Sequence, residues 1–352
     1  MRVALDATPL VLATGGLARY VAELSAALAE AFPHDDYALL SDREFPMPRP
    51  CRPNLFCGRG ARNVFERRWW TWGVQREMSR LHCEIFHGTN FEAPYAPLRA
   101  SVVTVHDLSP WMNPEWHSAA DRVRRRTPPL VGLRLATMII THTEAVRGQV
   151  IERFRVSPSR IAAVPLGASD VFRPVETLDR PPYFLYVGTL EPRKNLSRLI
   201  EAWRAVRNRY PVDLVLAGRR RADFAEPSPE PGLQLTGEVT DRDLARLYSG
   251  ALAVVYPSRY EGFGLPVLEA MQCGACVFIS KDAALREVAG DAGLSLDGAG
   301  AWVEAMCAAV NNPEWLEARR RASIARAREF SWARTARLTR EIYEEAQRRF
   351  RF

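Results

Sequence analysis

The stretch YFLYVGTLEPRKNLSRLIEAW, residues 183–203, decides how the chain folds. It opens with a run of apolar and aromatic residues that is typical of a β-strand. A turn with glycine and proline follows, and apolar residues then recur at helical spacing through position 209. A strand joined by a short turn to a helix is the repeating unit of a parallel sheet covered by helices. The stretch therefore predicts an α/β fold.

The same alternation of strand and helix patterns extends along most of the chain. Before residue 183, strands are expected at 3–6, 37–41, 84–87, 101–105, 137–141 and 161–165, with a first helix over 16–32. From residue 183 onward, strands are expected at 183–188, 213–218, 233–237, 253–257 and 276–280, with helices at 195–209, 241–250 and 266–273. These two series predict two doubly wound, Rossmann-like parallel-sheet domains.

The domain boundary is expected in a proline-rich stretch. Four prolines fall within 165–182, where the apolar pattern is weak. We therefore expect an N-terminal domain at 1–170, a linker at 171–182 and a C-terminal domain at 183–330. A final helix over 331–352 is expected to pack back on the first domain. Two such domains would face a central cleft lined by the carboxyl ends of both sheets, where open α/β sheets bind ligands.

The composition is that of a soluble globular enzyme. Of 352 residues, 47% are hydrophobic and 25% are charged, and no apolar run reaches the roughly 18 residues of a membrane-spanning helix. The first residues read as a strand rather than a signal peptide, so we expect a cytoplasmic protein. Six cysteines are too few for a disulfide scaffold in a chain of this length. Cys273 and Cys276 form a CxxC without a second pair, and we interpret them as buried thiols.

The net charge of +7 favours anionic partners. No nucleic-acid-binding motif accompanies the basic patches, so we do not expect nucleic acid as a partner. In 62–80, Trp69, Trp70 and Trp72 lie among arginines. This stretch is either a membrane-surface element or an ordinary helix that buries its tryptophans, and we favour the ordinary helix. Peripheral contact with acidic membrane lipid stays an open expectation.

Two stretches of the second domain suggest a site. Arg193 and Lys194 precede a helix, where two cations and free backbone amides suit a diphosphate, although such a pair is also common in solvated turns. In RYEGFGLPVLEAM, 259–271, Glu261 and Glu269 flank a glycine-containing loop that ends in Pro266, which we expect at the first helical position. This pattern suits binding of an elongated polyhydroxy ligand. The alternative is an acidic preference at a helix start.

The first domain offers weaker signals at the ends of its strands. Gly15 and Gly16 lie between the first strand and helix, where they let a phosphate or sugar approach the backbone. His106 follows a strand and is a candidate to hydrogen-bond a substrate hydroxyl, with His87 as the competing candidate. Asp241 and Asp243 form a DxD pattern. We interpret this pattern as helix capping rather than a metal site, so no metal ligand is expected.

Together these motifs resemble the retaining glycosyltransferases of family 4, which have the GT-B fold. The resemblance covers nearly the whole chain through GG, FHGTN, VHDLSP, VPLGASDVFRP, VGTLEPRKN, EGFGLPVLE and FSWARTA, in the family's order. The chain departs from the family at Thr189, where many members have arginine, and the resemblance then gives that charge to Arg193. It also has THTEAV at 141–146 in place of TVSEFS, and no role is assigned to this segment.

The resemblance implies a role for each candidate residue. Arg193 and Lys194 would neutralise the donor diphosphate in place of a metal ion, Gly16 would lie against phosphate or acceptor, and His106 would contact the donor sugar. Val239 would meet the base through its backbone, and Glu269 would bind the ribose. The donor sugar's hydroxyls would be held by Glu261 and by the amides of Gly262, Phe263, Gly264 and Leu265.

The implied activity is transfer of a hexose with retention, from a sugar nucleotide to a glycan or lipid-linked glycan. The N-terminal motifs resemble the mannosyltransferase branch that builds O-antigen and capsular chains, which favours GDP-mannose. UDP-glucose, UDP-N-acetylglucosamine and dTDP-rhamnose stay open as donors, and a sugar-nucleotide epimerase on the same fold is the rival activity. The sugar nucleotide would be a substrate, so no cofactor is expected.

Overall fold

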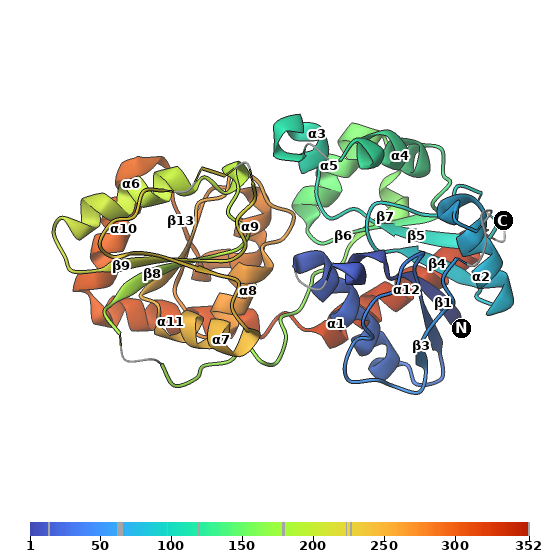
Figure 1. Ribbon diagram of the computed structural model, residues 1–352, viewed down its shortest axis with the longest axis horizontal. Helices are drawn as coiled ribbons and strands as arrows, with labels where there is room; N and C mark the ends of the chain where they lie inside the picture. The colour runs from blue at the N-terminus through green and yellow to red at the C-terminus, as the bar shows by residue number, and fades with distance from the viewer. Residues whose placement is uncertain are drawn as a thin grey trace. The chain divides into compact units, whose positions relative to one another are not determined.

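The computed structural model describes residues 1–12, 15–61, 66–96, 98–117, 120–177, 180–222, 224–225 and 227–350. The chain divides into two compact units (Figure 1). Unit 1 comprises Met1–Gly167 together with Ser331–Phe352, and unit 2 comprises Ala168–Phe330. The chain therefore leaves unit 1, builds all of unit 2, and returns to unit 1 with its last helix.

Unit 1 is built on a parallel sheet whose described strands run in the order β3-β2-β1-β4-β5-β6-β7. The strands are β1 (Arg2–Asp6), β2 (Asp36–Leu40), β3 (Leu55–Cys57), β4 (Ile85–Gly88), β5 (Ala100–Thr104), β6 (Met138–Thr141) and β7 (Ile161–Ala163). The α-helices are α1 (Gly16–Ala31), α2 (Val74–Arg80), α3 (Ser109–Met112), α4 (Asp121–Gly132), α5 (Glu144–Phe154) and α12 (Trp332–Phe350). Its central strands are buried along almost their whole length, as expected of a sheet covered on both faces.

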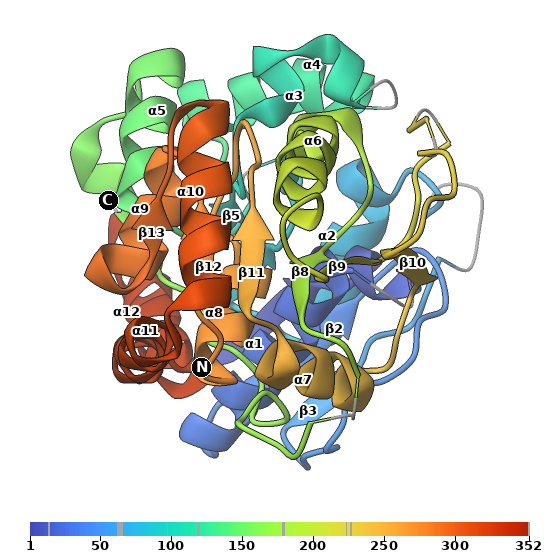
Figure 2. The ribbon, with the colours of Figure 1, turned by 90° about the vertical axis from the view of Figure 1, so that its left-hand side faces the viewer.

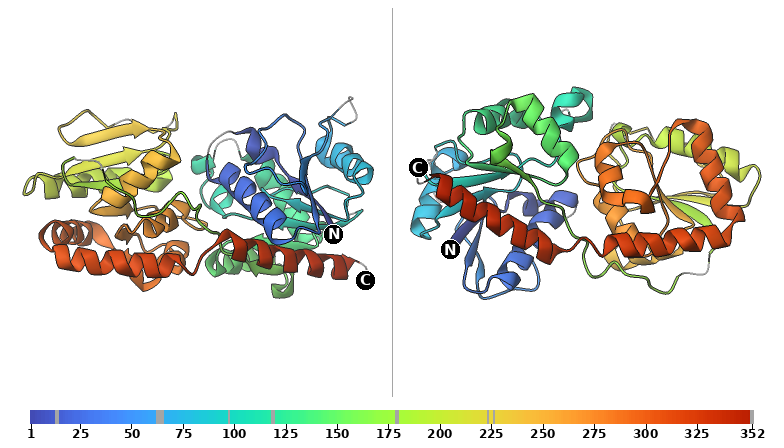
Figure 3. Two further views of the ribbon diagram at one scale, coloured as in Figure 1. Left: turned by 90° about the horizontal axis from the view of Figure 1, so that it is seen from below. Right: turned by 180° about the vertical axis from the view of Figure 1, so that it is seen from behind.

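Helix α12 joins unit 1 from the far end of the chain. It packs against α1 and against strand β5 (Figure 3). Tyr343 of α12 is fully buried, and its hydroxyl lies 2.7 Å from Nδ1 of His87 at the end of β4. The returning helix is therefore part of the core of unit 1.

Unit 2 repeats the same design. Its described strands run in the order β10-β9-β8-β11-β12-β13, which is the doubly wound 3-2-1-4-5-6 order. They are β8 (Tyr183–Val187), β9 (Asp213–Ala217), β10 (Leu233–Gly237), β11 (Ala253–Tyr256), β12 (Val277–Ile279) and β13 (Leu294–Ser295). The α-helices are α6 (Leu196–Arg207), α7 (Asp241–Gly250), α8 (Leu265–Gln272), α9 (Ala283–Ala289), α10 (Gly298–Asn311) and α11 (Pro313–Ala327).

The helices of unit 2 form a layer on each side of its sheet. Helices α6 and α10 pack together on one side (Figure 2). Helices α7, α8 and α11 lie on the other side, with α8 packed against both α7 and α11. The two doubly wound parallel sheets confirm the fold class predicted from the alternating pattern.

The segment expected as a linker contacts unit 2. Residues 171–182 are counted with unit 2. The described part of this segment is anchored there, because Phe172 is fully buried with its ring on Tyr248, and the Val175 amide donates to Ser249. The prolines restrict local secondary structure, but they did not reveal that an apolar side chain between them packs into a core.

The tryptophan-rich stretch has both buried and exposed parts. Trp69 and Trp70 belong to a π-helical turn, η2 (Trp69–Gly73), and pack with Val74 and Met78 of α2 against the sheet. Trp72 is 58% exposed. The ordinary-helix interpretation therefore holds for two of the three tryptophans, and residues 62–65 of the stretch lie outside the described residues. Among the described helices, none is both long and apolar enough to cross a bilayer.

Candidate functional site

The candidate site in unit 2 lies at the carboxyl edge of its sheet. Strand β8 stands between β9 and β11, so the strand order changes direction at β8 and β11. The chain segments that follow these two strands are 188–195 and 257–264. Because all the strands are parallel, both segments emerge at the same edge, which is where doubly wound sheets bind ligands.

The turn after β8 directs two cations inward. Residues Pro192–Lys194 form a single 3₁₀ turn, and Asn195 follows in the left-handed conformation with φ of 57°. The Asn195 side-chain amide donates to the carbonyl of Pro257, which ties this turn to the loop after β11. Arg193 and Lys194 are consequently buried, with Lys194 6% exposed. The alternative of a solvated surface turn is therefore excluded.

Lys194 forms a buried ion pair with Glu261 across the two loops. Its Nζ lies 2.5 Å from Glu261 Oε1 and 3.3 Å from the hydroxyl of Tyr256. The second oxygen of Glu261 accepts from Nη1 of Arg193 at 3.2 Å. The structure thus brings together three of the predicted site residues, and each oxygen of Glu261 contacts a cation.

The cations determine the protonation state of Glu261. Burial alone would raise the pKa of its carboxyl, but the charges of Lys194 and Arg193, together with the hydrogen bond from Lys194, outweigh burial and lower that pKa to about 2. Burial lowers the pKa of Lys194, and the neighbouring Glu261 opposes this change. At neutral pH, Glu261 is therefore a carboxylate that accepts hydrogen bonds and has no proton to donate.

Arg193 is held by carboxylates and by the loop after β11. Its Nε and Nη2 donate to Glu191 Oε1 at 3.0 and 2.7 Å, and its Nη1 donates to the Tyr260 carbonyl at 2.6 Å. The other oxygen of Glu191 accepts from Arg221 at 2.8 Å. Arg193 therefore positions the loop that carries Glu261. Its predicted contact with a diphosphate stays a prediction.

The glycine loop leads directly into helix α8. Gly264 has φ of 93°, a conformation that favours glycine, and a Cβ built there would lie 2.5 Å from Cδ2 of Leu285, so any larger residue would displace that side chain. The ring of Phe263 is buried against Phe330, so its side chain is part of the core rather than exposed in the loop. Because α8 begins at Leu265, Pro266 occupies the second helical position and not the first as expected.

Asp282 supports the same loop from the end of β12. Its Oδ1 accepts from the Leu285 amide and caps α9, and its Oδ2 accepts from the Glu261 amide at 3.2 Å. Burial raises the pKa of Asp282 to about 6, and the charge of Glu261 adds to that rise. One carboxyl group therefore fixes both the start of a helix and the backbone of Glu261.

The predicted base and ribose positions lie at the same edge of the sheet or on α8. Val239 is half-buried two residues after β10. Glu269 is buried within α8, where Oε2 accepts from the Tyr248 hydroxyl at 3.1 Å. Buried contact with a tyrosine excludes the interpretation of Glu269 as a merely helix-favouring surface residue. Its contact with a ribose stays a prediction.

In unit 1, the glycines at the start of α1 are open to solvent. Gly15 has φ of 110°, and a Cβ at Gly15 or Gly16 would meet no described atom within 4 Å. Packing within the described residues therefore does not account for Gly16. Its backbone amide at the start of a 16-residue helix is accessible to an anion.

His106 lies at the carboxyl edge of this sheet and pairs with a second histidine. Its Nε2 lies 2.7 Å from the Thr89 carbonyl, so Nε2 donates and carries a proton. Its Nδ1 lies 2.9 Å from Nε2 of His142. Burial lowers the pKa of His106 to about 4 and that of His142 well below its ordinary value. The Thr89 carbonyl thus fixes the tautomer of His106, whose Nδ1 can only accept. Nδ1 of His142 lies 3.3 Å from the Val164 carbonyl, so a neutral His142, with one N–H, donates either to that carbonyl or to His106.

This pairing constrains what His106 can do. Both of its ring nitrogens have partners in unit 1, so a hydrogen bond to a sugar hydroxyl would have to replace one of them. His87, the competing candidate, is fully buried between Tyr343 and Thr104, and burial lowers its pKa to about 3. The structure therefore assigns His87 to the core and leaves His106 as the candidate at the edge.

The DxD and CxxC patterns lie at a capped helix start and at two buried thiols. The Thr240 side chain accepts from the Asp243 amide and caps α7, and Asp243 pairs with Arg246 at the surface. Cys273 and Cys276 are buried free thiols. The interpretations as helix capping and packing are confirmed.

Comparison with known proteins agrees with this architecture. Residues 14–172 match the family described as Glycosyltransferase Family 4, and residues 169–328 match Glycosyl transferases group 1. The chain is 37% identical over 275 residues to the O-antigen chain mannosyltransferase B of Escherichia coli, an alignment that covers 70% of this chain and 71% of that protein. The chain belongs to glycosyltransferase family 4.

Solved structures place this glycosyltransferase in the GT-B fold. It superposes on the sucrose-phosphate synthase of Thermosynechococcus elongatus with a TM-score of 0.71 and 20% identity, covering 98% of each chain. It superposes on Anabaena HepE, solved with UDP and glucose, with a TM-score of 0.73 and 16% identity, covering 98% of this chain and 100% of that one. At these identities the likeness shows the fold alone.

Several residues of the glycosyltransferase site escaped sequence reasoning. Glu191, Asp282 and His142 each contact a predicted site residue, but none stands in a pattern that announces this contact. The departure THTEAV at 141–146 was the available signal for His142. It identified an unusual residue without showing that two strand ends bring it to His106.

Proposed function

We propose that this glycosyltransferase moves a hexose, with mannose from GDP-mannose favoured, to a hydroxyl of a glycan or lipid-linked glycan. The product would belong to a cell-surface polysaccharide such as an O-antigen, capsule or exopolysaccharide. The observation that carries the proposal is the buried Lys194–Glu261–Arg193 cluster at the carboxyl edge of unit 2. The choice of mannose rests on the similarity to the E. coli mannosyltransferase.

The chemistry proposed for this cluster is electrostatic. As the bond between the anomeric carbon and the diphosphate breaks, negative charge develops on the departing oxygen. Lys194, with the amides at the start of α8, would stabilise that charge without a metal ion. Glu261, an ionised acceptor, would hold sugar hydroxyls, and Glu269 would hold the ribose. His106 is retained as the proposed contact to the donor sugar.

Retention at the anomeric carbon is proposed to occur by front-face attack. The acceptor oxygen bonds to the anomeric carbon on the face that the diphosphate leaves, and a phosphate oxygen takes the acceptor's proton. Glu261 is not assigned as a covalent nucleophile, because its two oxygens contact Lys194 and Arg193. Double displacement, which requires a free carboxylate at the anomeric carbon, is therefore not proposed.

The acceptor and the location of the enzyme are part of the same proposal. A lipid-linked acceptor would bring a cytoplasmic enzyme to the inner face of the membrane. The exposed Trp72, beside the basic residues of α2, is consistent with peripheral contact with acidic lipid. No nucleic acid or cofactor is included in the proposal.

A thermal-shift panel of nucleoside diphosphates and their sugars tests the donor. GDP-mannose should raise the melting temperature more than UDP-glucose, UDP-N-acetylglucosamine or dTDP-rhamnose, since a ligand stabilises the state that binds it. No shift with any of them would refute the proposal. Conversion of the donor sugar without acceptor would indicate the epimerase instead.

Turnover assays test the mechanism. Lys194→Ala should lower turnover by about 100-fold or more. Activity should survive EDTA, and complete loss with chelator would refute the metal-independent route. Nuclear magnetic resonance of the product should show the anomeric configuration of the donor.

A further inference from the structure

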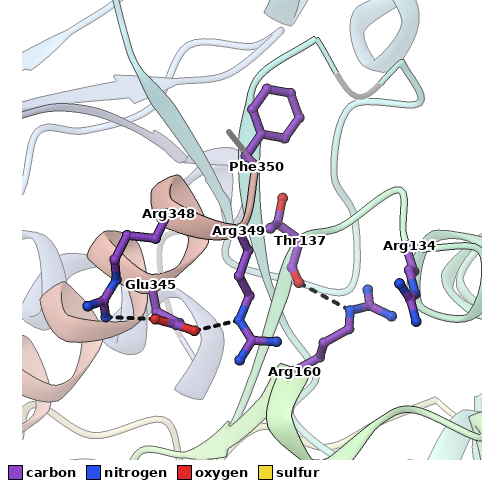
Figure 4. A pocket seen from close by; sticks show the side chains of 7 residues that line it. All are labelled: Arg134, Thr137, Arg160, Glu345, Arg348, Arg349 and Phe350. Carbon is purple, nitrogen blue, oxygen red and sulfur yellow. Dashed lines mark hydrogen bonds and ion pairs between the residues drawn. The ribbon is translucent and has the colours of Figure 1, made fainter. Parts of the chain in front are cut away.

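A pocket lies in unit 1, at the opposite edge of the sheet from His106. Thr137 and Arg160 line it and directly precede strands β6 and β7, whereas His106 and His142 follow strands β5 and β6. Because these strands are parallel, the pocket is at their amino edge. It measures about 600 Å³, and Figure 4 shows its lining residues: Arg134, Thr137, Arg160, Glu345, Arg348, Arg349 and Phe350.

The lining carries a large surplus of positive charge. The lining residues contribute four guanidinium groups and one carboxylate, that of Glu345. Glu345 pairs with Arg348 at 2.6 Å and with Arg349 at 2.5 Å, so it already serves the two arginines of α12 (Figure 4). Arg134 and Arg160, on the opposite wall, have no carboxylate of their own among the lining residues.

Arg160 is the buried floor of the pocket. It is 7% exposed and donates to the carbonyls of Val131, Ala136 and Thr137. Burial lowers the pKa of its guanidinium, and the neighbouring charges of Arg134 and Arg349 lower it further. The fold thus holds three like charges close together, an arrangement that a bound anion would stabilise.

Arg134 is held in an uncommon backbone conformation beside that floor. Its φ is 61°, in the left-handed region that costs a non-glycine residue on the order of 1 kcal/mol or more. Within the described residues, its side chain has no hydrogen bond or ion pair, and it extends toward Arg160 (Figure 4). Arg134 directly follows the C-cap of α4, where a left-handed residue commonly ends a helix, so its exposed guanidinium rather than its backbone is the feature that points to a ligand.

We propose that this pocket binds a phosphate-bearing anion. Guanidinium groups match phosphate oxygens with paired hydrogen bonds, and the volume lies within the roughly 300–1,000 Å³ of ligand pockets. Phe350 lines the pocket, and Leu133 beside Arg134 is 72% exposed, so the phosphate would be attached to an organic group. The site is independent of the glycosyl transfer proposed above, since it lies on the opposite edge of the sheet.

The test compares a pocket variant with a charge-matched control. Arg134→Gln with Arg349→Gln removes two pocket cations and keeps Arg160, whose loss would leave three carbonyls without a donor. Arg209→Gln with Arg321→Gln removes the same charge from exposed positions of unit 2. Both variants keep Lys194, so a difference between them is not due to the donor site. Circular dichroism checks folding, and single Arg134→Gln replaces the double variant should the latter fail to fold.

Two probes with the same phosphate chemistry distinguish a soluble ligand from a lipid. Calorimetric titration with glycerol 3-phosphate measures binding of a soluble ligand. Flotation with phosphatidic acid vesicles, compared with phosphatidylcholine vesicles, measures binding of a lipid. In at least one arm, wild type and control should bind and the pocket variant should bind at least tenfold more weakly. Absence of binding in both arms, or equal loss in pocket variant and control, would overturn the proposal.

Discussion

The Lys194–Glu261 ion pair makes a quantitative prediction about stability. Both side chains are at least nine-tenths buried, so removal of either partner leaves a charge in a low-dielectric environment. Breaking a buried pair in this way typically costs about 3–5 kcal/mol of unfolding free energy. The two single substitutions, Lys194→Met and Glu261→Gln, should both fall in this range.

The surrounding charges predict which substitution is worse. The cluster contains the cations Arg193, Lys194 and Arg221 and the anions Glu191 and Glu261. Lys194→Met leaves equal numbers of cations and anions, and Arg193 still contacts the carboxylate. Glu261→Gln leaves three cations around one carboxylate. Glu261→Gln should therefore cost about 5 kcal/mol and Lys194→Met about 3 kcal/mol.

Urea unfolding of the two single variants and the double variant measures these energies. Amide hydrogen exchange of peptides from β8 and β11 shows which urea unfolding transition belongs to unit 2. The double variant should cost about 2 kcal/mol less than the two single costs added together, since its partners are removed in the same molecule. The exposed Arg204–Glu230 pair of the same unit provides the control cycle, and its coupling should be far smaller. Additive costs at the buried pair, or a greater cost for Lys194→Met, would refute the charge-counting argument.

Three further outcomes follow from the same structure. The pKa of Glu261 falls from 4.5 to about 2 on folding, so the ionised carboxylate stabilises the folded state by about 3 kcal/mol. This stabilisation is complete above pH 4.5 and is lost as the pH falls to 2. The free energy of unfolding, measured in urea across this range, should show this decrease in wild type, and Glu261→Gln should lack it. Gly264→Ala should cost about 1–3 kcal/mol in thermal unfolding because of its positive φ and the close Leu285 side chain, and an unchanged melting temperature would contradict this. His142→Phe should lower turnover about 10- to 100-fold by releasing His106, and full activity would contradict the positioning role.

The sequence predicted the architecture because its signal is local and repeated. Each buried strand and each amphipathic helix carries its own periodicity, and the resulting order of elements allows few topologies. The short strands β3 and β13 were missed, whereas the similarly short β7 and β12 were found because they lie within longer apolar runs of the sequence. The contact of the expected linker with unit 2 was not predicted, because a single buried side chain, Phe172, is not a pattern.

The candidate site was predictable in its residues but not in its contacts. Lys194 and Glu261 were both identified, yet they were assigned to separate parts of a ligand, and their mutual ion pair depends on which strands are neighbours in the sheet. His142 also could not be assigned to the site from the sequence alone. Its partner is 36 residues away in sequence, and the pairing of β5 with β6 is what brings them together.

The return of α12 to unit 1 has a consequence for how the protein is made. During synthesis, all of unit 2 leaves the ribosome before the helix that carries Tyr343. Unit 2 can therefore fold while the core of unit 1 still lacks the partner of His87 and the surface that covers α1. The core of unit 1 is translated first and completed last. Nascent unit 1 must therefore remain unaggregated while about 160 further residues are translated. A chaperone that binds exposed apolar helices would act on it during that interval.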